Sequence, residues 1–257
     1  MIHSSTSHDH RKPRIVFIGH QTNGKSCLTL KRLITAEYNI VLVISNKKPE
    51  GEKDYLKSIL RPWTSIKKQC ARNQIPYVAV DPWATDKQVR NANRRLLSAR
   101  NVIEKARPDY LVCSTWHWLI HKDIIQLAGS CAVNCHSSLL PKYPGLCPTR
   151  APLINCDKET GATLHLMTPK ADLGDIILQK AFPLRWFDTP ATVYLKIVRV
   201  APLIIDNGLR SLIANTVKPI PQSQKAKIYR RLDCSHFWRK YLQNRVRVLF
   251  GKEPRRI

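Results

Sequence analysis

The sequence predicts a doubly wound α/β fold, in which helices cover both faces of a mostly parallel sheet, followed by a short basic helical appendage. Two observations indicate this fold class. Short apolar runs rich in β-branched residues alternate with longer segments of helical periodicity, a pattern typical of parallel sheets. In addition, a chain of 257 residues can hold one α/β domain of about 200 residues and an extension.

In the first half of the chain we expect five buried strands separated by helices. The strands are expected at residues 14–19, 38–45, 75–80, 109–113 and 132–136. The helices are expected at residues 25–34, at residues 62–73 with Pro62 at an early position, and from a cap at Thr85 to about residue 106.

After residue 136 the pattern changes. We expect a short helix at residues 148–156 and two closely spaced strands at 161–167 and 175–182. Thr189 and Pro190 predict the start of a long helix that reaches about residue 215, with Pro202 expected to kink or break it. A helix is also expected at 237–250. We therefore expect the chain to divide into three segments: a disordered tail at 1–13, a catalytic domain at 14–215 and a basic appendage at 216–257.

Composition restricts the classes of function. The net charge of +25 implies anionic partners such as phosphates, nucleic acid or polycarboxylates. No segment approaches about 20 uninterrupted apolar residues, and the N-terminus lacks a signal-peptide pattern, so we expect a cytoplasmic protein without a membrane contact. The eight cysteines contain no CxxC pair, which predicts thiols rather than disulfides and no metal site.

The fifth predicted strand ends in two polar side chains. Because side chains alternate along a strand, Asn134 and His136 should share one face while Cys135 points to the other. Pro144 and Gly145 then predict a turn-rich loop of the kind that carries sites at the carboxyl ends of strands in α/β sheets. Polar groups at a strand end are often structural, so this pair alone leaves the function open.

Asp172 adds an acid to this pair. It lies in the loop expected between the last two strands, where Gly174 should permit a tight turn. A carboxylate that contacts His136 would orient the ring and favour its charged form. The alternative is that Asp172 only initiates the turn.

A second candidate site lies near the N-terminus. The stretch from Gly19 to Ser26 matches GxxxxGK[ST], follows a predicted strand and opens a helix, which is the context of a phosphate-binding P-loop. It contains only two glycines, and bulky residues stand where backbone amides should surround a phosphate. We therefore favour weaker phosphate binding at the helix N-terminus and keep a P-loop nucleotide-binding protein as an alternative of another class.

Two motifs together resemble a known enzyme family. The stretch Asn-Cys-His-Ser-Ser-Leu-Leu-Pro that begins at Asn134 resembles the Asn-x-His-x-Ser-Leu-Leu-Pro signature of formyltransferases that use 10-formyltetrahydrofolate. The stretch Asp-Leu-Gly-Asp-Ile-Ile-Leu-Gln that begins at Asp172 resembles the family's second motif, Asp-x-Gly before an apolar strand. The order and spacing are also similar, and the resemblance extends over residues 14–215.

The resemblance implies a Rossmann-like formyltransferase fold and transfer of a formyl group from 10-formyltetrahydrofolate to a primary amine. It implies three catalytic residues: Asn134 as a neutral donor to the developing oxyanion, protonated His136 as an acid, and Asp172 as the support of the His136 pKa and a collector of the amine proton. It also places the reduced folate near seven residues: Trp116, Trp118, Leu119, Ile120, Thr168, Lys170 and Ala171.

The resemblance leaves three acceptors open. In the glycinamide ribonucleotide branch a Ser-Asn pair holds the substrate phosphate. Thr22 and Asn23 stand at that place, and we expect Lys25 and Ser138 to join them in substrate binding. The methionyl-tRNA branch carries a larger C-terminal domain. A nucleotide-linked amino sugar suits a compact chain with a short appendage, and we rank this acceptor first.

The appendage carries basic residues interleaved with Tyr229, Trp238 and Tyr241, which could contact a phosphate backbone. We favour the simpler interpretation of a solvated helix and rank RNA below it as a partner. A non-catalytic relative that binds RNA through this segment is the third hypothesis.

Overall fold

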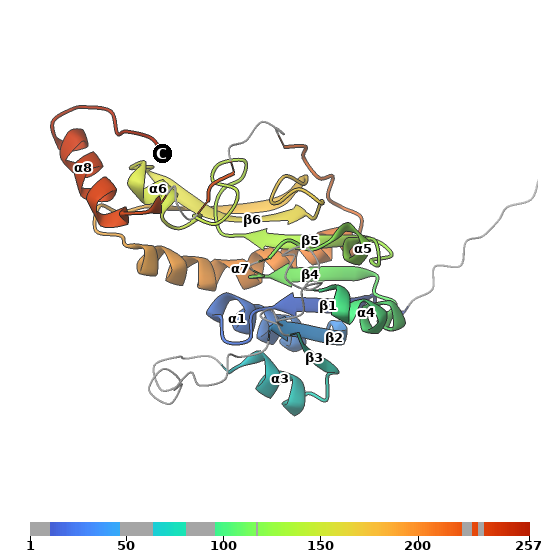
Figure 1. Ribbon diagram of the computed structural model, residues 1–257. Helices are drawn as coiled ribbons and strands as arrows, with labels where there is room; N and C mark the ends of the chain where they lie inside the picture. The colour runs from blue at the N-terminus through green and yellow to red at the C-terminus, as the bar shows by residue number, and fades with distance from the viewer. Residues whose placement is uncertain (1–10, 47–63, 81–95, 117, 223–227, 231–233) are drawn as a thin grey trace, which may run out of the picture.

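The computed structural model describes residues 11–46, 64–80, 96–116, 118–222, 228–230 and 234–257. Its centre is a seven-stranded sheet with the order β3-β2-β1-β4-β5-β6-β7 (Figure 1). The strands are β1 (Arg14–Gly19), β2 (Asn39–Asn46), β3 (Tyr77–Val80), β4 (Tyr110–Ser114), β5 (Cys131–His136), β6 (Glu159–Leu166) and β7 (Ile176–Pro183). Strands β1 to β5 pair in parallel, whereas β6 and β7 are antiparallel. The predicted mostly parallel sheet is confirmed.

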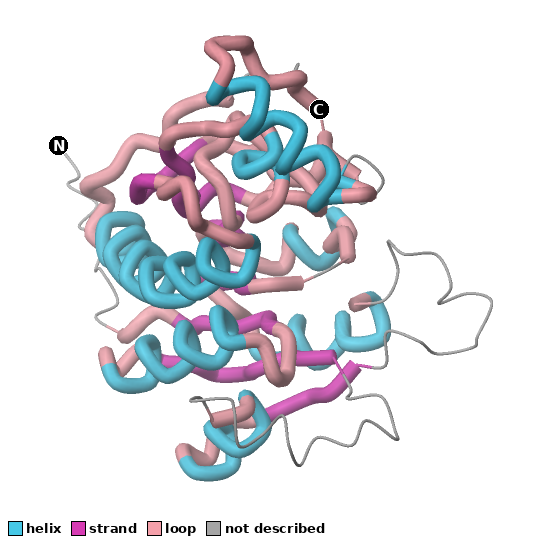
Figure 2. The backbone as a smooth tube through the Cα atoms, turned by 90° about the vertical axis from the view of Figure 1, so that its left-hand side faces the viewer, coloured by secondary structure: helices cyan, strands magenta, loops and turns pink. Residues whose placement is uncertain are grey.

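Helices lie on both faces of this sheet (Figure 2). They are α1 (Gly24–Thr35), α3 (Ile66–Arg72), α4 (Arg100–Ala106), α5 (Lys122–Ile125), α6 (Ala151–Ile154), α7 (Pro190–Ile213) and α8 (Phe237–Leu249), with a 3-10 turn, η2, at Leu97–Ala99. Side chains of α1, α3 and α7 share one hydrophobic cluster, and those of α4 and α5 share another. The fold is therefore doubly wound, as the alternating pattern predicted.

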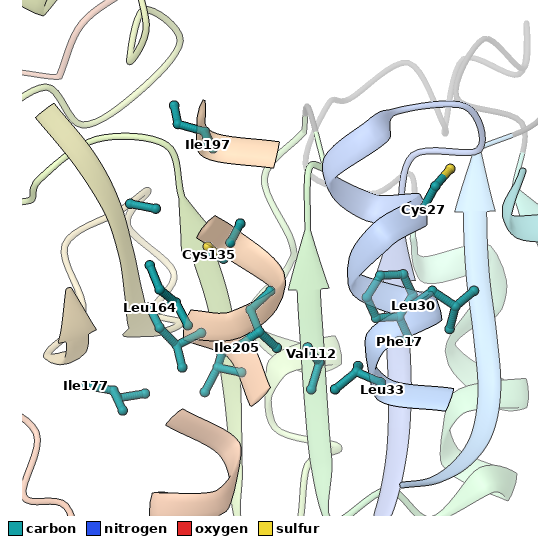
Figure 3. Close-up of a cluster of buried hydrophobic side chains, with 14 of the residues drawn as sticks. Phe17, Cys27, Leu30, Leu33, Val112, Cys135, Leu164, Ile177, Ile197 and Ile205 are labelled. Atoms are coloured by element: carbon teal, nitrogen blue, oxygen red, sulfur yellow. The ribbon is translucent and has the colours of Figure 1, made fainter. Parts of the chain in front are cut away.

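Alternate residues of β1 enter these two clusters. Phe17 packs with Leu30 of α1 and Val112 of β4 on one face (Figure 3). Ile18 packs with Ile103 of α4 on the other face. Burying a side chain of this size contributes about 1.5–3 kcal/mol. Packing on both faces thus holds the carboxyl ends of the central strands, which carry the site described below, in a fixed arrangement.

Three helix predictions need correction or fall partly outside the described residues. Helix α3 begins after Ser65, whose side chain accepts from the Lys68 N–H, and the expected start at Pro62 lies outside the described residues. The expected cap at Thr85 lies outside the described residues, and the described part of that segment forms η2 and α4. Helix α7 continues through Pro202 without a break. Burial of its apolar side on both sides of Pro202 compensates for the lost backbone bond, which costs about 3 kcal/mol.

Short elements were the hardest to predict. Helix α5 was not expected, since its four residues are too few to show a helical period. The expected helix at residues 148–156 is reduced to α6. Most other boundaries differ from the predictions by a few residues, as is usual for helix and strand ends.

Helix α8 is only half exposed to solvent, contrary to the favoured interpretation of a solvated helix. Phe237 and Tyr241 are buried in the same hydrophobic cluster as α7. The Asn244 side chain donates to the main-chain oxygen of Ile154 at 2.7 Å. Trp238, whose ring packs against Phe237 and Tyr241, is 57% exposed. Part of the basic sequence that could contact RNA, including Lys225, Lys227 and Arg231, lies outside the described residues.

Composition predicted free thiols instead of disulfides and no membrane-spanning segment. All eight cysteines lie in the described part of the chain, and none forms a disulfide there. Among the described residues, no helix combines the length and the apolar character that crossing a bilayer requires. The fold is thus held together by packing and hydrogen bonds rather than by covalent links between cysteines.

Candidate active site

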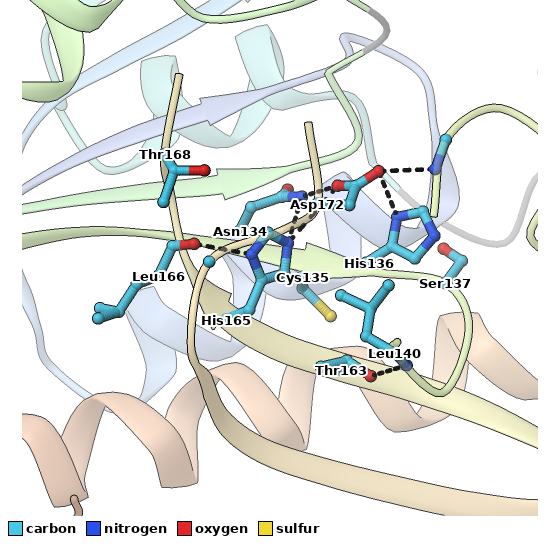
Figure 4. Close-up of polar contacts among 12 residues, drawn as sticks. Asn134, Cys135, His136, Ser137, Leu140, Thr163, His165, Leu166, Thr168 and Asp172 are labelled. Atoms are coloured by element: carbon cyan, nitrogen blue, oxygen red, sulfur yellow. Dashed lines mark hydrogen bonds and ion pairs between the residues drawn. The ribbon is translucent and has the colours of Figure 1, made fainter. Parts of the chain in front are cut away.

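Asn134, His136 and Asp172 converge at the carboxyl end of β5 (Figure 4). The Asn134 amide nitrogen lies 3.4 Å from Oδ1 of Asp172. Nδ1 of His136 lies 3.4 Å from Oδ2 of the same carboxylate. Cys135 points to the other face, into the hydrophobic cluster, and burial raises the pKa of its thiol. The alternation along the strand therefore produces the expected shared face.

In the loop between β6 and β7, Asp172 has a backbone conformation that is rare for residues other than glycine. Its φ is +55°, in the left-handed region, which Asp tolerates better than most side chains. Gly174, expected to supply this freedom, is not among the residues with positive φ. A Cβ at Gly174 would instead collide with the main-chain oxygen of Leu166. The glycine is thus required for a close backbone approach, and the turn directs Asp172 toward β5.

The Asp172 carboxylate is surrounded by donors. The Gly145 N–H donates to Oδ2 at 2.9 Å. Burial alone would raise the pKa of Asp172, but His136, His165 and the Gly145 N–H together lower this pKa below its ordinary value. Asp172 is therefore ionised at neutral pH.

Both ring nitrogens of His136 face acceptors. Nδ1 faces Asp172, and Nε2 lies 3.0 Å from the main-chain oxygen of Tyr143. Burial lowers the pKa of His136, and the opposing effects of Asp172 and the Tyr143 oxygen do not restore its ordinary value. Removal from water thus opposes the charged ring, whereas the two acceptors that face the ring would each receive an N–H of its protonated form.

His165 belongs to this cluster but was not predicted from the sequence. It lies on β6 directly opposite Asn134 in the strand register. Its Nε2 is 3.2 Å from the Asn134 amide nitrogen and 3.6 Å from Oδ1 of Asp172. Its Nδ1 lies 2.8 Å from the main-chain oxygen of Leu166. If Nδ1 donates to that oxygen, Nε2 is left to accept from Asn134 and fixes the amide.

The only available sequence signal for His165 was a polar residue within an apolar strand. Its importance depends on the antiparallel pairing of β5 with β6, which periodicity along one strand does not reveal. The side chain is 2% exposed, so a polar group at this position requires the partners that it has.

Lys25, the lysine of the P-loop match, lies against the carboxyl end of β5. Its Nζ donates to the main-chain oxygen of Cys135 at 2.6 Å and to Oγ of Ser137 at 3.2 Å. Ser26 donates to the main-chain oxygen of Ser114. The two side chains that a P-loop would direct to phosphate and magnesium are thus bonded to the protein, which gives the P-loop alternative no support.

A cavity of about 780 Å³ opens over the converged residues, a size typical of small-molecule sites. Its lining includes the three predicted catalytic residues, Asn23 and Lys25. It also includes all seven residues predicted to bind folate: Trp116, Trp118, Leu119, Ile120, Thr168, Lys170 and Ala171. The structure therefore brings the two predicted sets into one space.

Two of the residues predicted to bind substrate do not line this cavity. Ser138 is fully buried, and its hydroxyl donates to the main-chain oxygens of Lys142 and Tyr143. It therefore supports the loop that contacts His136. Thr22 also lies outside the lining, whereas Asn23, beside it, accepts from the Lys25 N–H and caps α1.

The aromatic part of the cavity contains a buried donor. Trp116 and Trp118 pack edge to face with centroids 5.1 Å apart. The indole N–H of Trp116 is buried and has no hydrogen-bond partner among the described residues. A buried donor without a partner costs about 1–3 kcal/mol, and Trp116 also lines the cavity.

Part of the cavity lining comes from regions that the sequence did not connect to the site. These residues are Tyr194 of α7 and the C-terminal residues Ile228, Tyr229 and Arg230. Their positions depend on how the chain returns to the sheet after α7, and no local pattern specifies that path.

Comparisons with known proteins agree with this geometry. Residues 13–205 match the family model described as Formyl transferase. The chain is similar to the N-formyltransferase from Helicobacter canadensis, solved with folinic acid and dTDP-3-aminofucose, at 19% identity and a TM-score of 0.61, with 85% of this chain and 71% of that one covered. It is also similar to glycinamide ribonucleotide transformylase 1 from Symbiobacterium toebii, at 20% identity and a TM-score of 0.65, covering 81% and 94%.

A third solved structure resembles the chain to a similar extent. It is the formyltetrahydrofolate deformylase from Pseudomonas syringae pv. tomato, at 20% identity and a TM-score of 0.64, with 83% of this chain and 67% of that one covered. At these identities the structures establish a shared fold, and the family match over most of the chain carries the assignment.

Proposed function

The chain belongs to the formyl transferase family, and from this premise we propose that it transfers a formyl group from 10-formyltetrahydrofolate to a primary amine of an anionic acceptor. The observation that carries the proposal is the convergence of Asn134, His136 and Asp172 in a cavity that the predicted folate residues also line. An amide donor, an imidazole and a carboxylate are the groups that acyl transfer to an amine requires.

The lining of the cavity supports a folate as the donor. The unpartnered Trp116 N–H offers a hydrogen bond to a flat heterocycle, and Trp118 and Ile120 offer apolar contact. Lys170 adds a positive charge for the anionic end of a folate. When bound, the folate supplies the formyl carbon that the amine attacks.

Asn134 is proposed to stabilise the oxygen that becomes negative as the amine adds. Its amide nitrogen has one contact at 3.2 Å to His165 and a longer one at 3.4 Å to Asp172. The longer bond is weak, so this N–H is available to be shared with a developing oxyanion while His165 holds the amide in place. Removing one such donor typically costs 10² to 10³ in kcat, about 2.7–4 kcal/mol.

We propose that His136, rather than Asp172, receives the proton that leaves the amine. Efficient bases have pKa values near the working pH, and the lowered pKa of Asp172 makes it a weak base. A neutral His136 can accept the proton, and the resulting imidazolium then donates to Asp172 and to the Tyr143 oxygen. Asp172 acts as the negative charge that stabilises this ion.

A nucleotide-linked amino sugar remains the acceptor that we rank first. The cavity lining combines Arg230 with Tyr194 and Tyr229, which suits a phosphate and a flat base. The Helicobacter protein was solved with such a sugar. Glycinamide ribonucleotide and methionyl-tRNA are the alternative acceptors, and RNA binding through the basic appendage is a separate proposal.

One assay tests both donor and acceptor. Purified protein is incubated with 10-formyltetrahydrofolate and, in turn, nucleotide-linked amino sugars, glycinamide ribonucleotide and methionyl-tRNA. We expect tetrahydrofolate to form only with an amine present and the acceptor to gain a formyl group by mass spectrometry. Formate release without any amine would assign hydrolysis instead. A protein that binds no reduced folate would overturn the proposal.

A further inference from the structure

We propose that Gln222 and Tyr229 are part of the active site and position Asp172 and His136. Both residues lie beyond residue 205, where the match to the family ends. The inference rests on the proposed function for its catalytic consequence, although the positioning itself can be measured without turnover. Three sets of contacts carry it.

The first set fixes the loop of Asp172. After α7 the chain returns to the sheet, where Ile220 and Ile176 of β7 exchange two backbone hydrogen bonds of 2.8 Å. This pairing places the Gln222 side chain under the loop, where its amide nitrogen donates to the main-chain oxygens of Asp172 and Gly174. Gln222 is buried. One side chain therefore holds the Asp172 turn, whose positive φ needs such support.

The second set fixes the donor that faces the Asp172 carboxylate. The Tyr229 N–H donates to the Pro144 oxygen at 2.8 Å, and the Tyr229 oxygen accepts from the Leu146 N–H at 2.7 Å. Between these bonds lies Gly145, with φ +98° and its N–H on Asp172 Oδ2. A Cβ at Gly145 would collide with the Tyr229 oxygen. Tyr229 thus holds the glycine in the conformation that presents its N–H to the carboxylate.

The third set fixes the acceptor that faces His136. The rings of Tyr229 and Tyr143 pack with centroids 5.2 Å apart, and the Tyr143 main-chain oxygen is the partner of His136 Nε2. The Tyr229 hydroxyl donates to the main-chain oxygen of Ile257 at 2.9 Å. The tyrosine ring is therefore anchored on one side and supports the His136 loop on the other.

These contacts control the two groups that raise the pKa of His136. Asp172 and the Tyr143 oxygen raise this pKa, whereas burial, His165 and Lys25 lower it. Cys113 also lies near the carboxylate, but burial raises its pKa to about 12, so its thiol remains neutral. If Gln222 or Tyr229 no longer holds its loop, the raising groups move away and the pKa of His136 falls. Gln222 and Tyr229 are therefore positioning residues, since they act through other groups.

The test uses point variants of the full chain. Gln222→Leu removes the bonds to the Asp172 and Gly174 oxygens, and Tyr229→Ala removes the ring that packs on Tyr143 while keeping the main-chain bonds of residue 229. Each should lower kcat about tenfold or more, since a misplacement of about 1 Å can cost 10². The KM for the folate should change little. The acid limb of the kcat profile should move to lower pH, because that limb follows the pKa of His136. Tyr229→Phe keeps the ring and should retain most of the activity.

The matched control is Gln243→Leu on the exposed side of α8, with unchanged kcat and pH profile expected. Circular dichroism and Tm establish folding, and Gln222→Asn replaces Gln222→Leu if the latter does not fold. Independently of turnover, an NMR titration should show a lower pKa for His136 in Gln222→Leu than in the wild type. An unchanged pKa and an unchanged pH profile would overturn the inference. Absence of formyl transfer by the wild type would instead overturn the proposed function. The titration of His136 would then still decide whether Gln222 positions Asp172 and His136.

Discussion

Nδ1 of His136 lies 3.4 Å from Oδ2 of Asp172 at the carboxyl end of a central strand, with the two side chains 8% and 14% exposed. Burial lowers the pKa of the ring, and the donors around the carboxylate outweigh its burial and lower the pKa of Asp172. This arrangement can take up one proton without creating an isolated buried charge, because the imidazolium would form beside the carboxylate.

Replacement of Asp172 by Asn should therefore abolish most of the activity. The amide keeps the shape but removes the charge that stabilises protonated His136, and we expect kcat to fall by about 10² or more. Steady-state kinetics at neutral pH measures the loss. Asp123→Asn, a partly exposed carboxylate in α5, is the matched control and should retain wild-type kcat. Wild-type kcat in Asp172→Asn would contradict the proposed role of the carboxylate.

Lys25→Met should move the pH profile in the direction opposite to that of the Gln222 variant. Lys25 is one of the groups that lower the pKa of His136, so its removal should raise this pKa and shift the acid limb of kcat to higher pH. Lys31→Met on the exposed side of α1 controls for the general loss of a positive charge. A shift to lower pH would contradict this electrostatic assignment.

The lowered pKa of His136 also predicts a pH-dependent contribution to stability. The ordinary pKa is 6.5, and below it the unfolded chain binds a proton that the folded protein resists. The ring therefore costs the folded state increasing free energy as the pH falls below 6.5. Relative to the wild type, His136→Gln should gain unfolding free energy between pH 7 and pH 5, measured by urea denaturation at each pH. A difference that does not change with pH would refute the shifted pKa.

His165→Leu should lower kcat while leaving the folate affinity near that of the wild type. The variant removes the ring nitrogen that lies 3.2 Å from the Asn134 amide nitrogen, so the donor proposed for the oxyanion would lose its orientation. We expect a loss of about tenfold or more, smaller than the 10² to 10³ for a missing oxyanion donor because Asn134 itself remains. His121→Leu, a partly exposed histidine, is the control. Equal effects of the two substitutions would argue against a specific role for His165.

Trp116→Phe tests whether the indole N–H contributes to binding of the folate that donates the formyl group. The phenyl ring keeps the apolar contact but removes the buried donor, so the affinity for a reduced folate should fall by about 1–2 kcal/mol, roughly tenfold. Isothermal titration with 5-formyltetrahydrofolate measures the affinity. Trp238→Phe on the exposed side of α8 is the control and should not change it. An unchanged affinity in Trp116→Phe would show that the ligand leaves this N–H unpaired.

Features that repeat along the chain were predictable from the amino-acid sequence. The alternation of strands and helices predicted the parallel part of the sheet, and the alternation along β5 placed Asn134 and His136 on one face and Cys135 on the other. The motif resemblance added Asp172 as their partner, and the structure brings the three together. These inferences succeeded because each depends on residues that are close in sequence or on a motif that spans both sites.

Contacts between residues that are distant in sequence, and the effects of burial, could not be predicted and came from the tertiary structure. The β5–β6 register places His165 opposite Asn134, and the return of the chain after α7 places Gln222 and Tyr229 against the catalytic loops. Burial also lowers the pKa of His136, since a ring with the same neighbours in water would keep a higher pKa. Residue types and motifs along the chain thus predicted which chemical groups the site contains. The electrostatic environment of these groups and the residues that hold them follow from packing, because desolvation and contacts between distant residues exist only after the chain has folded.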